Sequence, residues 1–346
     1  MLGPLGDKWA SDPQRNPAAN NAEKPPNPCL KSTNLHPANN HRSIPHPLNL
    51  EMPKLAPTTR FFCLLLLACV LCSCGETKST SAENTVAEST AKQPAPATNK
   101  VLLVEDVDWT QLNPARGDKS PLAGTLWGDR NGEVPTGFLA RFPKGFSSPP
   151  HIHNVSYRAV VIEGLIHNDD PMAAPMWMAP GSFWTQPAGE AHITSADGDA
   201  NMCLVEIDRG PYLVQPTEEA FDNGERPINV DVSNVIWLDA PNTNNGAQIS
   251  YLWGNPKSSQ DYGVFMKLPA GFAGDVLTSG TTFRGVVISG AASYTIPGEG
   301  TQHTLAPGSY FTSTGDAVHS IGTKSACVVY VRTNGRIEFA AAHLSL

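Results

Sequence analysis

The sequence predicts an all-β protein built from two similar tandem units, on the evidence of its composition and of an internal repeat. Its 346 residues include 29 Gly and 31 Pro, and only 16% are charged, which favours short strands and many turns over long helices. Short runs rich in Val and Ile recur between turn residues, as at 158–164 and 202–207. We therefore expect strands and turns, and no extended amphipathic helix.

The internal repeat divides the folded part of the chain into two halves. Residues 143–164 align without a gap onto residues 269–290, and identical residues occupy eight of the 22 positions. Self-similarity at a fixed spacing indicates two copies of one structural unit. We predict a first unit over residues 101–215 and a second unit over residues 216–346.

The N-terminal part is predicted to lie outside the two repeated units. Residues 1–51 are dense in Pro and Asn, so we expect them to be disordered or to precede a true start at Met52. Residues 52–73 resemble a bacterial lipoprotein signal, in which Leu71-Cys-Ser-Cys74 is similar to a lipobox. The apolar run Phe61 to Ser73 has 13 residues, fewer than the roughly 20 that cross a bilayer.

Lipid attachment at Cys74 follows from this resemblance, and residues 74–100 then form a flexible tether rich in Ser, Thr, Ala and Glu. Gly75 follows the cysteine, where an aspartate would indicate retention at the inner membrane. In a Gram-negative host the resemblance implies an exported lipoprotein of the outer membrane that faces the periplasm. The membrane would then be a partner through the lipid anchor.

The charge of the chain disfavours nucleic acid as a partner. The formal net charge is −8, and the segment from Cys74 onward is more acidic still. Nucleic-acid binding depends on basic side chains that neutralise phosphates. A small-molecule ligand or substrate is the expected partner, and a homo-oligomer is a further candidate.

Two motifs in the first half supply three histidines at metal-ligand spacing. They occupy residues 145–153 and 181–192 and contain His151, His153 and His192. Residues i and i+2 of a strand point to the same face, so the first two imidazoles can bind one ion, and a neighbouring strand can add the third. Imidazole suits Zn, Cu, Fe and Ni, and three protein ligands leave further coordination positions open.

The two motifs resemble the signature of the cupin superfamily, G-x5-H-x-H-x3-4-E-x6-G followed by G-x5-P-x-G-x2-H-x3-N. Eight positions agree with it: Gly145, His151, His153, Gly164, Gly181, Pro187, Gly189 and His192. Two positions depart, because Tyr157 (or Arg158) stands at the glutamate and Ala196 at the asparagine. The resemblance implies two tandem cupin jelly-roll barrels (double-stranded β-helices), a bicupin, with the three histidines as metal ligands.

Comparison of the two halves locates the metal site in the first barrel. Leu277 and Ser279 stand where the first half has His151 and His153, and only His319 has a histidine counterpart. We therefore predict one divalent transition metal per chain, Fe or Zn before Mn, Ni or Cu. The second barrel is predicted to be degenerate, with His319 in a structural role.

Residues that both halves share are predicted to belong to the framework, since one half lacks the site. The matched pairs are Trp127 with Trp253, Arg158 with Arg284, and Cys203 with Cys327. The two cysteines lie in apolar runs, so we expect small buried side chains. A disulfide between them is possible in an oxidising compartment, although equivalent positions in separate barrels usually lie far apart.

Two residues are candidates for completing the site. Tyr157 could bind the metal, hydrogen-bond a bound ligand, or pack as Phe283 does in the other half. Glu206, matched by Tyr330, is the strongest carboxylate candidate, although it could also face solvent. Both are kept as catalytic candidates.

Three functions are compatible with such a site. A three-histidine site without a carboxylate resembles that of thiol, diketone and gentisate-type dioxygenases, which implies an iron-dependent enzyme acting on a small organic substrate. The first motif also resembles the zinc-binding cupin domain of ChrR-type anti-sigma factors, which implies a non-enzymatic binding or sensing lipoprotein. The third interpretation is a structural metal, which would require a fourth protein ligand that closes the site.

Overall fold

The computed structural model describes residues 98–341, which form β-strands joined by turns and short 3-10 helices. No α-helix occurs in this range, and no helix within it is long and apolar enough to cross a membrane. The all-β prediction is therefore confirmed. The predicted extension, the signal sequence, Cys74 and all but the last residues of the tether lie outside the described residues.

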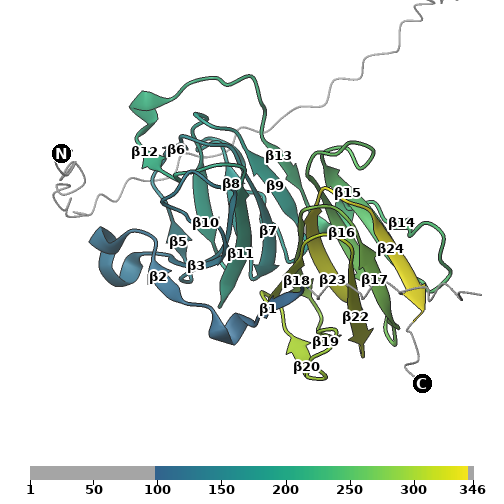
Figure 1. The fold of residues 1–346 in the computed structure, drawn as a ribbon. Helices are drawn as coiled ribbons and strands as arrows, with labels where there is room; N and C mark the ends of the chain where they lie inside the picture. The colour runs from purple at the N-terminus through teal and green to yellow at the C-terminus, as the bar shows by residue number, and fades with distance from the viewer. Residues whose placement is uncertain (1–97, 342–346) are drawn as a thin grey trace, which may run out of the picture. The chain divides into compact units, whose positions relative to one another are not determined.

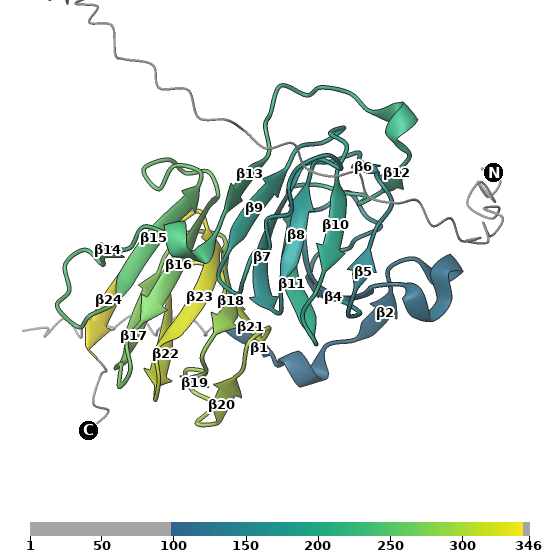
Figure 2. The ribbon, with the colours of Figure 1, turned by 180° about the vertical axis from the view of Figure 1, so that it is seen from behind.

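The strands form two jelly-roll barrels, which run from blue to teal and from green to yellow in Figure 1 and are seen from behind in Figure 2. The first barrel contains β2 (Trp109–Gln111), β3 (Leu122–Trp127), β4 (Thr136–Phe142), β5 (Phe146–Ser147), β6 (Ile152–His153), β7 (Tyr157–Glu163), β8 (Ile166–Asp169), β9 (Phe183–Gln186), β10 (Ile193–Ala196), β11 (Asn201–Ile207), β12 (Val214–Gln215) and β13 (Ile228–Val230).

The second barrel has a similar set of strands, which confirms the predicted tandem architecture. They are β1 (Lys100–Leu102), β14 (Leu238–Asp239), β15 (Gln248–Trp253), β16 (Tyr262–Leu268), β17 (Ala273–Thr278), β18 (Phe283–Ser289), β19 (Ala292–Thr295), β20 (Gln302–Leu305), β21 (Tyr310–Ser313), β22 (Ala317–Thr323), β23 (Cys327–Thr333) and β24 (Ile337–Ala341). The 3-10 helices are η1 (Val104–Asp106), η2 (Pro114–Lys119), η3 (Thr217–Glu219) and η4 (Val232–Asn234).

Each barrel combines one large antiparallel sheet with smaller ones. In the first barrel the large sheet has the order β13-β9-β7-β11-β4-β3-β2, and the smaller sheets are β5-β10-β8 and β12-β6. In the second barrel the large sheet has the order β1-β21-β18-β23-β16-β15-β14, and the smaller one is β20-β19-β22-β17-β24. The three histidines lie on or beside β6 and β10, which are strands of the smaller sheets of the first barrel.

The large sheet of the first barrel is buried on both faces. On β11, Cys203 and Val205 point into the core of the first barrel, whereas Met202 and Leu204 point into a second core that includes residues of the other barrel. Successive strand residues point to opposite faces. A strand that is buried on both faces reads as a continuous apolar run, which explains the composition of residues 202–207.

The shared core joins the two barrels through their large sheets. Leu139 and Leu204 of the first barrel cluster there with Phe265, Val286 and Tyr330 of the second. These side chains are fully or almost fully buried. Burial of this kind contributes roughly 25 cal/mol for each Å² of apolar surface, so the barrels stabilise one another.

Two reciprocal cation–π contacts cross this shared core. The Arg158 guanidinium lies 3.9 Å from the ring centre of Trp253, and that of Arg284 lies 5.2 Å from the ring centre of Trp127. Each pair joins an arginine of one barrel to a tryptophan of the other. The framework role predicted for these four residues is confirmed, since they attach the barrels to each other.

The sheet pairing differs from the predicted division of the chain at residue 216. Strand β13 follows that boundary but pairs with β9 of the first barrel, with Ile228 opposite Thr185. Strand β1 precedes the first barrel but pairs with β21 of the second, with Lys100 opposite Thr312. Each connecting segment thus supplies an edge strand to the neighbouring sheet, which satisfies backbone groups that would otherwise be unpaired.

The second barrel has a buried histidine, and its described residues, up to residue 341, contain no histidine cluster. His319 is fully buried; its Nδ1 lies 2.6 Å from the Tyr294 hydroxyl and its Nε2 lies 3.0 Å from Ser313 Oγ. Both ring nitrogens therefore have partners, and the predicted structural role is confirmed. Cys203 and Cys327 are free and buried, also as predicted.

Candidate metal centre

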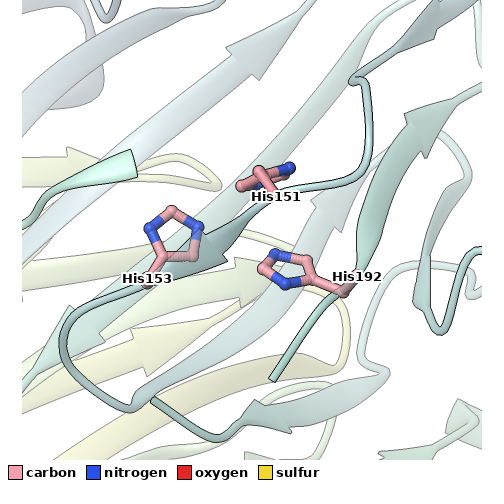
Figure 3. A group of neighbouring side chains, drawn as sticks. All are labelled: His151, His153 and His192. Carbon is pink, nitrogen blue, oxygen red and sulfur yellow. The ribbon is translucent and has the colours of Figure 1, made fainter. Parts of the chain in front are cut away.

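Backbone pairing brings the two histidine motifs together. His151 and His192 form an antiparallel bridge in which each backbone N–H donates to the other's carbonyl, over 3.1 and 3.0 Å. Residues directly opposite one another in such a pair present their side chains to the same face. His153, two residues beyond His151, shares that face, and Figure 3 shows the three rings turned toward one another.

The motif glycine Gly189 supports this arrangement. Its backbone N–H donates to the His153 carbonyl over 2.8 Å, and its φ of +78° lies in the left-handed region that favours glycine. A Cβ at this position would approach the Phe221 carbonyl oxygen to 2.4 Å. A larger residue would therefore displace the turn that leads to His192.

The three imidazoles form a compact, buried group. One nitrogen from each ring lies within 4.8 Å of the others, a separation that a single metal ion can span. The side chains are only 7%, 2% and 1% exposed for His151, His153 and His192. In residues 98–341, no aspartate, glutamate or cysteine joins this group of candidate ligands.

The tautomer of each histidine is fixed by a backbone carbonyl. The Nδ1 contacts are His151 with Pro149 (2.9 Å), His153 with Leu213 (2.9 Å) and His192 with Glu190 (3.2 Å). A carbonyl can only accept, so Nδ1 carries the proton in all three rings and Nε2 keeps its lone pair. Carbonyl contacts of this kind orient histidines that bind metals.

Burial keeps the three imidazoles neutral. It lowers the pKa of His192 to about 3 and that of His151 below its ordinary value. The pKa of His153 is lowered well below that value, first by burial and then by the neighbouring His192 and His151. A neutral imidazole is the form that binds a metal, so the group is ready to coordinate at neutral pH.

Two phenol groups border the histidine cluster. The Tyr157 hydroxyl lies 3.5 Å from His192 Nε2, and the Tyr212 hydroxyl lies 3.1 Å from His153 Nε2. The Tyr212 ring also stacks on His153, with ring centres 4.4 Å apart. Burial raises the pKa of both phenols, so each remains protonated. Tyr157 thus lies beside the histidine cluster, where the sequence placed it as a candidate site residue.

A buried polar network continues from Tyr157. Its hydroxyl donates to Asn168 Oδ1 over 2.9 Å, and Thr194 Oγ1 donates to the same oxygen over 2.8 Å. The Asn168 amide donates to Gln186 Oε1 over 3.0 Å. We did not predict Asn168, Thr194, Gln186 or Tyr212. Polar residues at inward positions of β8, β9 and β10 were the available signal for the first three, whereas Tyr212 lies in a loop without a pattern.

Glu206, the predicted carboxylate candidate, does not belong to this site. Its Oε1 accepts a hydrogen bond from the Tyr330 hydroxyl over 2.7 Å and lies 3.7 Å from the guanidinium groups of both Arg158 and Arg332. On β11 it shares the outward face with Leu204, and the shared core excludes it from solvent. Burial raises the pKa of this carboxyl, and the two arginines oppose that shift.

Solved structures with the same architecture include a candidate dioxygenase from Nostoc punctiforme, with a TM-score of 0.54 and 14% identity over 73% of this chain and 85% of that one. Salicylate 1,2-dioxygenase from Pseudoaminobacter salicylatoxidans, in an adduct with gentisate, gives 0.46 and 14% over 70% and 85%. Vicilin from Corylus avellana gives 0.47 and 11% over 68% and 87%. The first of these matches shows a shared fold, that of tandem cupin barrels.

The comparison with curated protein sequences gave no match. A family profile described as a domain of unknown function (DUF4437) matches residues 100–340. The matched range contains both barrels, the three histidines and the strands that exchange between the sheets. The chain therefore belongs to the DUF4437 family.

Proposed function

We propose that this protein binds one divalent transition metal through the Nε2 atoms of His151, His153 and His192 and acts as a metal-dependent dioxygenase on a small organic substrate. The observation that carries the proposal is the common tautomer of the three rings, which leaves the lone pair of each Nε2 free within a group whose ligand atoms lie within 4.8 Å of one another. Histidines with only a structural role would not be expected to share one tautomer. His319, for comparison, uses both ring nitrogens in hydrogen bonds.

Iron is the metal that this proposal favours, because neutral imidazoles suit ferrous iron and a three-ligand site leaves positions for a substrate and for oxygen. The protein's own residues would bind, orient and isolate the substrate. Tyr157 and Tyr212 lie next to the ligating atoms and can hydrogen-bond a bound molecule. The near-complete burial of the histidines excludes water from the reacting centre.

The candidate dioxygenase of Nostoc punctiforme shares the fold, which makes the same reaction class the first to test. The fold does not by itself supply the reaction. The function therefore depends on the histidine site and on the two phenols beside it.

A second candidate function is metal-dependent binding or sensing without turnover. The position of Tyr212 is compatible with it, because its hydroxyl, 3.1 Å from His153 Nε2, can hydrogen-bond a molecule in the open position of a tetrahedral zinc ion. The resemblance of the first motif to ChrR-type cupin domains supports zinc as the metal of such a protein. Ligand binding would then change the contacts that the protein makes, and the ligand itself would not react.

We also propose that the protein is a lipoprotein held by lipid on Cys74 and directed to the periplasmic side of the outer membrane. The lipobox-like sequence Leu71-Cys-Ser-Cys74 and the residue Gly75 support this location. The barrels begin near residue 100, so the segment between them and Cys74 would keep the site away from the membrane surface.

Metal analysis followed by oxygen uptake tests the function. Protein purified without added metal should contain close to one iron per chain and should consume oxygen with a small thiol, diketone or phenol. One zinc per chain without oxygen uptake would replace the dioxygenase by the binding function. Absence of any metal after exposure to iron and to zinc would refute both.

A further inference from the structure

The polar network beside the histidines has a fixed direction. Gln186 donates its amide N–H to the Glu190 carbonyl over 3.1 Å, which turns Gln186 Oε1 toward the Asn168 amide. The Asn168 oxygen therefore faces Tyr157 and Thr194 and accepts the hydroxyl protons of both. A carbonyl cannot donate, so Glu190 sets the direction of every later hydrogen bond in the chain.

Tyr157 is consequently presented to the site as a hydrogen-bond acceptor. Its one proton is donated to Asn168, so its oxygen, which lies 3.5 Å from His192 Nε2, can only accept further hydrogen bonds. The indole N–H of Trp184 is also directed at this oxygen, over 3.5 Å. A ligand that meets Tyr157 must therefore supply a proton donor.

Tyr212 has the opposite polarity. Its hydroxyl lies 3.1 Å from His153 Nε2, and His153 already donates its Nδ1 proton to the Leu213 carbonyl. Nε2 can only accept, so Tyr212 is the donor of this hydrogen bond. A metal at Nε2 takes up the same lone pair, which leaves the Tyr212 hydroxyl as a free donor beside the metal.

We propose that Tyr157 and Tyr212 select a bidentate oxygen ligand that has one hydroxyl proton and one anionic oxygen, such as an α-hydroxycarboxylate. The hydroxyl of the ligand donates to Tyr157, and its anionic oxygen accepts from Tyr212. This inference rests on the proposed metal site and names the substrate class for it. Acceptor and donor lie beside different histidines, so a chelating ligand can reach both while it binds the metal.

Ligand binding to the cobalt-substituted, full-length protein tests the inference. Glycolate and methoxyacetate differ in the hydroxyl proton, and their affinities are measured from the visible absorption of cobalt(II). The wild type should prefer glycolate. Because metal chelation also favours a hydroxyl over an ether, the informative quantity is the change in the glycolate-to-methoxyacetate ratio between variants.

Tyr157→Phe should lower this ratio about fivefold to tenfold, the effect of one lost hydrogen bond. Asn168→Leu should lower it as well, because it removes the acceptor that fixes the Tyr157 proton. Tyr212→Phe should weaken both ligands by a similar factor of about ten, since both have a carboxylate for its hydroxyl. A matched control is Tyr294→Phe, which removes a phenol beside His319 in the second barrel and should change neither affinity.

An unchanged ratio in Tyr157→Phe with one cobalt per chain would overturn the inference, as would a cobalt protein that does not respond to glycolate. Oxygen uptake is a separate measurement. Glycolate selectivity without oxygen uptake on any substrate would refute the dioxygenase and leave the ligand class standing. Oxygen uptake combined with an unchanged ratio would refute the ligand class alone.

Discussion

Acid should release the metal only when the protein unfolds. Protons compete with the metal for Nε2, and burial makes this competition weak because it lowers the pKa of His192 to about 3 and those of His151 and His153 in the same direction. The folded protein therefore keeps its ligands neutral at pH values where an exposed histidine, with a pKa of about 6.5, is charged.

The expected size of this effect follows from the number of ligands. In an exposed three-histidine site every imidazole would take up a proton, so the metal affinity would fall about 10³-fold per pH unit below pH 6.5. For His192, a pKa of about 3 in place of 6.5 favours the neutral form by about 5 kcal/mol. Because the pKa values of His151 and His153 are lowered in the same direction, we expect the affinity of the folded protein to fall much less steeply with pH than that of the exposed site.

The same pKa values determine the stability of the apoprotein in acid. A histidine whose pKa is lowered by folding contributes stability above about pH 6.5, and this stability declines as the pH falls from 6.5 toward 3, because the unfolded chain takes up the protons. Zinc-loaded protein should be titrated with acid while a chromophoric chelator reports free zinc and circular dichroism reports folding. Zinc release centred near pH 6.5 with an unchanged dichroism spectrum would refute this reasoning.

Three further predictions address the ligands, the corrected carboxylate and the lipid anchor. His151→Ala/His153→Ala should reduce metal content from about one ion per chain to near zero, and full retention would contradict the site. Glu206→Gln should lower the free energy of unfolding by about 3 kcal/mol in urea, since it breaks a buried ion pair, while metal content stays unchanged. Cys74→Ser should leave an unprocessed precursor, and wild-type protein that incorporates no labelled fatty acid would contradict lipid attachment.

The histidine cluster could be predicted from the sequence because two short-range rules determine it. His151 and His153 share a face through strand alternation, and the second motif returns the chain to them at His192. Alignment of the two halves then assigns the site to the first half, because Leu277 and Ser279 replace two of the histidines in the second. The three histidines lie within about 50 residues of chain, and the comparison of the halves needs only an ungapped alignment, so neither step requires knowledge of distant packing.

Glu206 shows where the same rules gave no answer. Alternation assigns a face only when one side of a strand is polar, and β11 is apolar on both faces because the second barrel covers its outer one. The direction of Glu206 depends on that contact between barrels, which the sequence does not express. Tyr212 was missed for a related reason, since a loop has no period from which to infer which side chains face the site.

The shared core also explains why the second barrel is required although it lacks metal ligands, since it supports the first barrel. Its large sheet covers the outer face of the sheet that contains Tyr157, with Arg158 and Glu206 held between Trp253 and Arg332. None of those contacts involves Leu277 or Ser279, the positions that correspond to the histidines, which lie on or beside β17 in the smaller sheet. With Leu277 and Ser279 in place of two histidines, the second barrel therefore has no metal site, and the core that supports the first barrel stays buried.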